Sequence, residues 1–229
     1  MYGHQQRKQD TEGGIYISKR LIENLSQWLP SSFECVGDNE IPAIIKEENT
    51  DIPENWLGFN YCKSARTLSG VGIHMFVDDY QLQRLWNAPS RYIDALKKAA
   101  LVCSPDFGLY VDVPKVLNMY NHYRKHWLAA YWQREGIKVI PTVCWSDEDS
   151  FAWCFDGDPI GGTVAVSSVG TQRNADSREA FMLGYDAMLE RLHPETILFW
   201  GIVPPDARGN IIPMGTFTDQ MKARKEALA

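Results

Sequence analysis

The sequence predicts an α/β fold with a parallel sheet, arranged as an irregular or incomplete (β/α)-barrel. Its central strand candidates are nearly continuous apolar runs, which are typical of strands buried on both faces of a parallel sheet. Helical patterns alternate with these runs through short connections, as in βαβ units. The candidate strands are residues 41–45, 55–62, 71–77, 100–104, 138–145, 163–169, 196–203 and 210–215.

Eight candidate strands suit a barrel, but the first units of the chain are too short to contain full crossover helices. An open doubly wound sheet is therefore the alternative architecture. No internal repeat and no linker divides the chain. We expect a mobile N-terminal tail over residues 1–14 and a single α/β domain over residues 15–229.

Apolar positions at helical spacing predict the helices between these strands. Gly136 is a typical stop signal for the longest helix, and Asp176 and Glu179 have the spacing of a capping box at the start of a later one. The expected helices are residues 16–30, 81–99, 114–135 and 147–155, one that begins near residue 176, and a charged C-terminal helix.

Charge and cysteine usage limit the partners and the compartment. The formal net charge of −6 makes nonspecific nucleic-acid binding an unfavourable function. The five cysteines include no CxxC pair, which indicates a reducing, cytoplasmic environment. The polar N-terminus does not resemble a signal peptide, and no apolar stretch approaches the ~20 residues that span a bilayer, so we expect no membrane partner.

Acidic side chains follow three consecutive predicted strands directly. Asp78 and Asp79 come after the third candidate strand, Asp106 after the fourth and Asp147 after the fifth. Because the carboxyl ends of parallel strands lie on one side of a sheet, we expect these side chains to meet in one ligand-binding mouth. The local alternative is that an aspartate after a strand caps the next helix or holds a turn.

Clustered carboxylates raise one another's pKa unless a nearby cation offsets their repulsion. The cluster therefore has two chemical interpretations. Asp79 and Asp106 are candidate catalytic residues as a general acid and base, or candidate ligands of a divalent cation. No other cofactor is indicated. Arg124 would neutralise the rim or hold an anionic ligand, although an arginine on an amphipathic helix is commonly a surface residue.

Several side chains near the same strand ends are candidates for ligand binding. Trp145 and Trp200 would stack on a planar ligand, or else plug the end of the barrel. Ser167 and Ser168 begin a loop whose backbone amides would hold a phosphate, with a plain tight loop as the alternative. The long helix after Asp106 brings Asn121 near the mouth.

The histidines are interpreted as structural. His122 and His126 have the i, i+4 spacing of metal ligands, but the glutamate of an HExxH motif and a third ligand are missing. A packed or exposed pair is therefore favoured over a metal site. His74 lies inside a predicted strand and is most simply a hydrogen-bonded core histidine.

Five stretches resemble a family of unknown function carried by bacteria, phages and other mobile elements. They are "GVGIHMFVDDYQLQRLWNAPSRYI", "SPDFGLYVDVP", "NMYNHYRKHWLAAYWQREGIKVIPTVCW", "FDGDPIGGTVAVSSVG" and "LERLHPETILFWG". The resemblance covers about residues 40–205 and implies no activity, but it places Asp78, Asp79 and Asp106 at matching motif positions. Family members usually carry serine after SPDF, where this chain has Gly108. For a phage-encoded member, the compartment is the cytoplasm of the host.

Two functional hypotheses follow from the sequence. The first is a hydrolase or phosphodiester-processing enzyme that binds a small or anionic ligand in a carboxylate-rich mouth. The alternative is a non-catalytic protein that captures a small ligand or inhibits a host factor, in which case a host protein is the partner.

Overall fold

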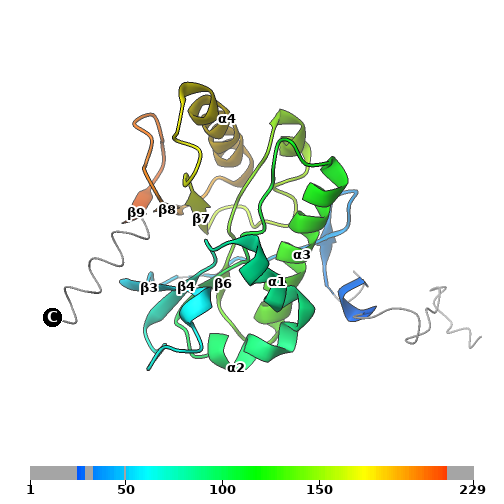
Figure 1. Ribbon diagram of the computed structural model, residues 1–229, viewed down its shortest axis with the longest axis vertical. Helices are drawn as coiled ribbons and strands as arrows, with labels where there is room; N and C mark the ends of the chain where they lie inside the picture. The colour runs from blue at the N-terminus through cyan, green and yellow to red at the C-terminus, as the bar shows by residue number, and fades with distance from the viewer. Residues whose placement is uncertain (1–24, 29–32, 49, 216–229) are drawn as a thin grey trace, which may run out of the picture.

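The computed structural model describes residues 25–28, 33–48 and 50–215 and shows two parallel sheets with helices packed against them (Figure 1). The first sheet has the order β3-β4-β5-β6 and the second the order β7-β8-β9. Their strands are β3 Asn55–Gly58, β4 Val71–His74, β5 Leu101–Cys103, β6 Val139–Ile140, β7 Thr163–Ser167, β8 Thr196–Trp200 and β9 Ile211–Gly215.

The two sheets join just beyond β6. Thr142 and Ala165 form a parallel bridge, and the Val143 N–H donates to the Ala165 carbonyl at 2.9 Å. The strands therefore follow one another in chain order across the junction. Trp56 of β3 packs edge-on against Trp200 of β8, with ring centroids 5.3 Å apart, so the strands curl toward each other.

The predicted parallel α/β architecture in an open, incomplete form is confirmed, because β3 and β9 do not pair within the described residues. The count of eight parallel strands is wrong. Residues 41–45 contribute only β2 Ile41–Pro42, which pairs antiparallel with β1 Cys35–Val36 in a separate hairpin. The sequence of so short a segment reveals that it is apolar, but not which strand it pairs with or in which direction.

The predicted helix 81–99 is broken in the structure. Pro89 lacks the N–H that would continue the helix, so α1 Asp79–Asn87 ends before it. The chain continues as the 3-10 turn η4 Pro89–Tyr92 and the short α2 Ile93–Leu96.

The longest predicted helix is confirmed as α3 Lys115–Arg134. Pro114 precedes it, and Gly136 follows with a φ of 84°, a left-handed conformation that glycine adopts without strain. The short helix expected at 147–155 is the 3-10 helix η5 Glu148–Ala152.

The last described helix, α4 Ala175–Leu192, begins at a different cap from the predicted one. The Asn174 side chain accepts the Ser177 N–H at 2.8 Å, whereas Asp176 lies inside the first turn. The capping box of Asp176 and Glu179 was therefore the wrong assignment, by two residues.

Three expected elements lie wholly or mostly outside the described residues. They are the tail 1–14, the helix 16–30, of which the structure describes the 3-10 turn η1 Leu25–Trp28, and the charged C-terminal helix.

Both faces of β7 and β8 in the second sheet are buried, as their apolar sequences predict. Ile197 and Phe199 of β8 pack with the α4 side chains Tyr185 and Met188 in one core cluster. Leu198 of the same strand faces the other cluster, which also holds the apolar side chains of α1 and α3. None of the described helices combines the length and apolar character needed to cross a membrane.

The Asn174 cap yields a stability prediction. Asn174→Ala should lower the free energy of unfolding by about 1 kcal/mol, because the Ser177 N–H loses its acceptor. Glu179→Ala is the control and should stay within about 0.5 kcal/mol of wild type. Urea denaturation measures both, and the reverse order of effects would restore the capping box.

Candidate pocket at the strand ends

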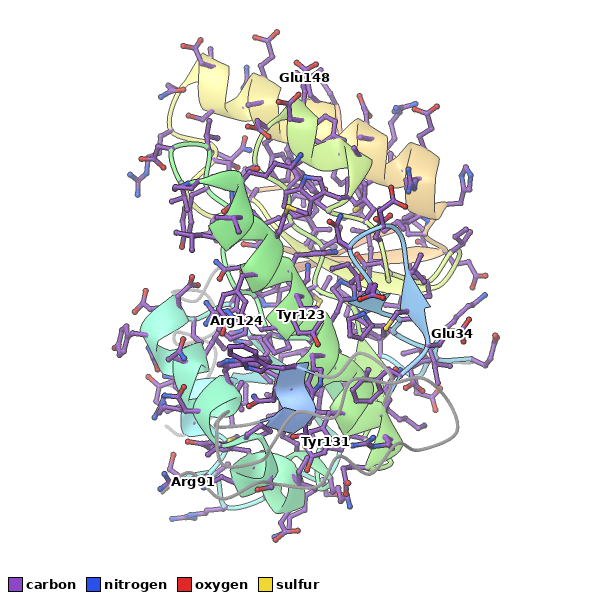
Figure 2. All side chains as sticks on the ribbon, turned by 90° about the vertical axis from the view of Figure 1, so that its right-hand side faces the viewer. Glu34, Arg91, Tyr123, Arg124, Tyr131 and Glu148 are labelled. Carbon is purple, nitrogen blue, oxygen red and sulfur yellow. The ribbon has the colours of Figure 1, made fainter. Side chains whose placement is uncertain are left out.

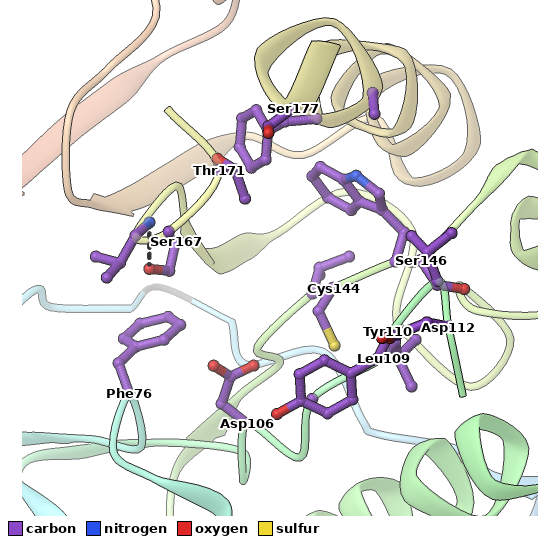
Figure 3. Close-up of a pocket in the computed structure, with 18 residues that line it drawn as sticks. Phe76, Asp106, Leu109, Tyr110, Asp112, Cys144, Ser146, Ser167, Thr171 and Ser177 are labelled. Atoms are coloured by element: carbon purple, nitrogen blue, oxygen red, sulfur yellow. Dashed lines mark hydrogen bonds between the residues drawn. The ribbon is translucent and has the colours of Figure 1, made fainter. Parts of the chain in front are cut away.

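A cavity of about 530 Å³ lies beyond the carboxyl ends of the strands, between the two sheets and the amino-terminal half of α4 (Figure 3). Its walls combine aromatic rings with hydroxyl groups. The lining includes Phe76 after β4, Asp106, Gly108, Tyr110 and Asp112 after β5, Cys144, Trp145 and Ser146 after β6, Ser167, Gly170 and Thr171 after β7, and Ser177 and Phe181 of α4.

Asp106 places a carboxylate in this cavity, beside Phe76 and Cys144 (Figure 3). Burial raises the pKa of Asp106 to about 6, and the ionised Asp79 adds to that rise while Lys125 opposes it. Ser104, two residues earlier, fixes the strand end, since its hydroxyl accepts the Thr142 N–H at 2.8 Å. Asp106 is thus the predicted acidic residue that reaches the pocket with a pKa suited to proton transfer.

Lys125 of α3 is fully buried, with 0% of its surface exposed, at the junction of the two sheets. Its ammonium donates to the Thr142 carbonyl at 3.0 Å and lies 3.7 Å from the Cys144 sulfur. Burial works against the charged form, but Cys144, Asp158 and Asp106 outweigh it and raise the pKa of Lys125. The ammonium is therefore a buried positive charge that the charges of Asp158 and Asp106 favour.

Cys144 lines the same pocket but is not an activated nucleophile. Burial raises the pKa of its thiol to about 12, against the lowering effect of Lys125. The sulfur lies 3.8 Å from the Phe107 carbonyl, to which the thiol donates. Because the thiolate is the reactive form of cysteine, this side chain is inert near neutral pH.

The loop after Asp106 is held by α1 and α3. Asp79, the first residue of α1, accepts the Gly108 N–H with both oxygens at 3.3 Å. Asn121 donates to the Gly108 carbonyl at 2.7 Å, and Asn118 bonds both the N–H and the carbonyl of Tyr110. Asp79 and Asn121 therefore position the loop, and neither of them lines the pocket.

Gly108 leaves room for the ring of Tyr110. A Cβ at position 108 would lie 2.4 Å from the Tyr110 hydroxyl oxygen, closer than real contacts allow. A serine at this position would therefore displace the half-exposed ring of Tyr110. Glycine here lets Tyr110 fold back toward Asp79, which raises the pKa of the Tyr110 hydroxyl together with the larger effect of burial.

Arg124 lies behind the loop and does not line the pocket. Its guanidinium stacks 3.6 Å from the Phe107 ring centroid and donates to the Gln83 side chain at 2.6 Å. Its charge helps to lower the pKa of Asp79, which burial raises. The structure thus uses Arg124 to join α1, α3 and the loop.

The remaining predicted ligand-binding residues divide into two groups. Trp145 and Ser167 line the pocket, and Trp145 fits because Gly184 of α4 leaves room for its ring. The other four do not line it. Asp78 is exposed at the start of α1, and Asp147 accepts the Ser150 N–H as the cap of η5. Ser168 donates to the Ile202 carbonyl, and Trp200 packs in the core.

The expected mouth of four clustered aspartates therefore does not form. Asp106 and Asp112 are the acidic side chains that line the pocket, and Asp112 is at its exposed rim. The described residues include no group of three or more His, Cys, Asp or Glu side chains placed to hold a metal ion. The positive charge of Lys125 acts on Asp106, and Asp79 already accepts the Gly108 N–H. These two carboxylates therefore fit a divalent cation poorly.

The histidines pack inside the protein, as the sequence analysis favoured. His122 lies 2.9 Å from the Asp156 carbonyl, and His126 lies 3.1 Å from the Pro42 carbonyl. Burial lowers the pKa of both rings well below the usual value. His126 also lies 3.4 Å from Asp158, whose pKa burial raises to about 7 against the lowering effect of Lys125.

Lys125, Tyr110 and Cys144 were not predicted as site residues from the sequence. A signal for Lys125 was present, because it stands three, four and seven residues before the buried Leu128, Ala129 and Trp132. A lysine on the apolar stripe of a helix is rarely buried without carboxylate or carbonyl partners. Tyr110 has no such signal, since its position depends on the conformation of the loop.

A family model described as Domain of unknown function (DUF4417) matches residues 33–217. The Gene 1 protein of Mycobacterium phage L5 is 41% identical over 133 residues, which is 58% of this chain and 58% of that protein. The Gene 1 protein of Mycobacterium phage D29 is 36% identical over 182 residues, which is 79% of this chain and 65% of that protein. The chain thus spans less than two thirds of these relatives. No solved structure matches the chain significantly.

The Asn118 contacts predict how the loop is stabilised. Asn118→Ala should lower the free energy of unfolding by about 1–3 kcal/mol, because two backbone groups of Tyr110 lose buried partners. It should also speed hydrogen exchange at the Tyr110 amide. Lys115→Ala, at an exposed site on the same helix, should change neither quantity. Wild-type exchange at Tyr110 in Asn118→Ala would contradict this role.

Proposed function

We propose a function from the pocket itself, because the chain belongs to the DUF4417 family, whose description names no activity. The proposal is a hydrolase or phosphodiester-processing enzyme in which Asp106 is the general base. It rests on one observation: Asp106 is the carboxylate in a sizeable pocket whose pKa is raised to about 6.

Asp106 is suited to move a proton at neutral pH. A pKa of about 6 leaves the carboxylate ionised at pH 7 yet basic enough to accept a proton from a bound water. The water oxygen then attacks the electrophilic centre, and Asp106 returns the proton to the leaving oxygen. Lys125 keeps the pKa from rising further, so the base stays ionised.

The pocket walls favour a ligand with a planar ring and an anionic group. Phe76, Trp145 and Phe181 offer apolar surface for a ring. Thr171 and Ser177 bring hydroxyls to the opposite wall, where α4 begins, and the partial positive charge at the amino end of a helix attracts anions. A phosphodiester with an aromatic or heterocyclic substituent matches both halves.

In this proposal the other two predicted catalytic residues act through the loop. Asp79 holds Gly108 and Arg124 holds Phe107, the two residues that follow Asp106 directly. Both are positioning residues. No step is assigned to a divalent cation, because Asp79 already accepts the Gly108 N–H and the described residues offer no group of three or more ligand side chains.

A non-catalytic binding role is the second candidate, because apolar side chains stand exposed at the rim of the pocket. Tyr110, Val111 and Val169 are 48%, 71% and 68% exposed and all line it. Such a rim suits contact with a partner molecule, including a host protein. In this role the protein would capture its ligand without turnover.

Substitution of Asp106 tests the catalytic proposal. With bis(p-nitrophenyl) phosphate as substrate, Asp106→Asn should reduce kcat/KM by about 10²–10⁴-fold, because the base is removed. The wild-type value should rise with pH and level off above about pH 6, as the carboxylate loses its proton. Release of p-nitrophenolate measures both.

Asp112→Asn is the matched control, since Asp112 lines the exposed rim of the same pocket. It should leave kcat/KM within about twofold of wild type, in line with an exposed side chain away from the reaction. Equal turnover by Asp106→Asn and wild type would contradict the proposal. Ligand binding by wild type without turnover of any phosphodiester would favour the binding role.

A further inference from the structure

A pair of buried titratable side chains lies where the β1–β2 hairpin packs against α3. Figure 2 shows this hairpin, which begins just after Glu34, on the flank of α3. His126 of α3 and Asp158, in the loop before β7, have side chains that are 0% exposed, and His126 Nε2 lies 3.4 Å from Asp158 Oδ1. Neither residue lines the pocket at the strand ends, and the proposed reaction does not use them.

Hydrogen bonds hold this pair between the hairpin and α3. The N–H of Ile44, two residues after β2, donates at 2.8 Å to the carbonyl of Gly157, the residue before Asp158. His126 Nδ1 lies 3.1 Å from the carbonyl of Pro42, the last residue of β2. The hairpin therefore contacts both the ring of His126 and the backbone beside Asp158.

The Pro42 contact determines which nitrogen of His126 carries a hydrogen. Because a carbonyl oxygen can only accept, Nδ1 must be the donor, and Nε2 of the neutral ring is then an acceptor. Neither Nε2 nor either oxygen of Asp158 has a hydrogen-bond partner in the part of the chain that the structure describes. An ionised Asp158 beside a neutral His126 would therefore bring two buried acceptors face to face. One added proton, on either side, makes them a donor and an acceptor.

The charges around the pair indicate the same added proton. The buried ammonium of Lys125 interacts electrostatically with both Asp158 and Asp106. If both carboxylates were ionised, two negative charges would face this one buried cation. A proton held between Asp158 and His126 restores neutrality, which a buried cluster favours. Burial raises the pKa of Asp158 to about 7, in the same direction.

The other titratable groups around the pair are neutral or are paired elsewhere. The ring of His122 packs on the histidine of the pair with centroids 4.3 Å apart, and burial lowers the pKa of His122 well below the usual value. Burial raises the pKa of the thiols of Cys144 and Cys154, so both stay protonated. Asp156 forms an ion pair with Arg191 at 3.0 Å. These groups therefore leave the charge balance between the pair and the buried cation unchanged.

We propose that Asp158 and His126 share one buried proton, which fastens the β1–β2 hairpin to α3 and is lost as the pH rises above neutrality. Whether the proton rests on Oδ1 or on Nε2, one group donates and the other accepts. After its loss the two atoms repel each other, and the ring that bonds the Pro42 carbonyl is held less firmly. The pair is thus a pH-sensitive lock within the fold.

Asp158→Asn tests the shared proton, because the amide N–H of asparagine can donate to His126 Nε2 at every pH. The pKa of Asp158 is raised above its unfolded value of about 3.9, so the stability from its proton is complete below about pH 4 and is lost as the pH rises to about 7. The ratio of the folding equilibrium constants of wild type and Asp158→Asn should therefore fall about tenfold per pH unit across this range. Urea denaturation at several pH values measures this ratio.

Asp149→Asn, at an exposed site, is the control for the loss of a carboxylate. Its ratio to wild type should stay constant within about twofold over the same pH range. A constant ratio for Asp158→Asn would overturn the proposal, since Asp158 would then be ionised in the folded protein, as in an ordinary ion pair with Lys125.

NMR of the wild-type protein counts the protons without any substitution. At pH 6 the nitrogen-15 shifts of His126 should show a hydrogen on Nδ1. They should also show a hydrogen on Nε2, or else the carbon-13 shift of Asp158 should be that of a protonated carboxyl group. A neutral His126 beside an ionised Asp158 at this pH would contradict the shared proton, even if Asp158→Asn failed to fold.

Discussion

The arrangement of the pocket depends on one buried cation. Lys125 reaches the junction of the two sheets, where its ammonium bonds the carbonyl of Thr142, the residue that bridges to Ala165 of the second sheet. A lone ammonium in that position would be strongly destabilising, and the charges of Cys144, Asp158 and Asp106 favour its charged form. Lys125 in turn holds the pKa of Asp106 below the value that burial alone would give.

The loop after Asp106 illustrates how the rest of the molecule supports this group. Side chains from α1 and α3 bond the backbone at Gly108 and Tyr110, so the loop is fixed by helices that pack in the core cluster of Leu198. The opposite wall comes from α4, which packs in the core cluster of Ile197 and Phe199. The pocket thus lies where two separately packed layers meet, a common position for ligand sites in proteins.

Much of the fold was predictable because it depends on hydrophobic pattern, whereas the site was only partly predictable. The apolar runs identified the parallel strands, and strand-end geometry identified Asp106 as a pocket residue. The same rule failed for Asp147, since whether an aspartate caps its own helix depends on one local hydrogen bond. How deeply a side chain is buried is not written in the sequence, so the burial of Lys125 was not predicted. The end of α1 before Pro89 was not predicted either.

We infer that burial and Lys125 together determine the protonation of Asp106. Carbon-13 NMR of the side-chain carboxyl, followed from pH 4 to 8, measures it directly. We expect Asp106 to titrate near pH 6 in wild type and at a higher pH in Lys125→Met, where the opposing cation is gone. Titration near the ordinary aspartate value of about 3.9 in wild type, or no shift in Lys125→Met, would contradict the account.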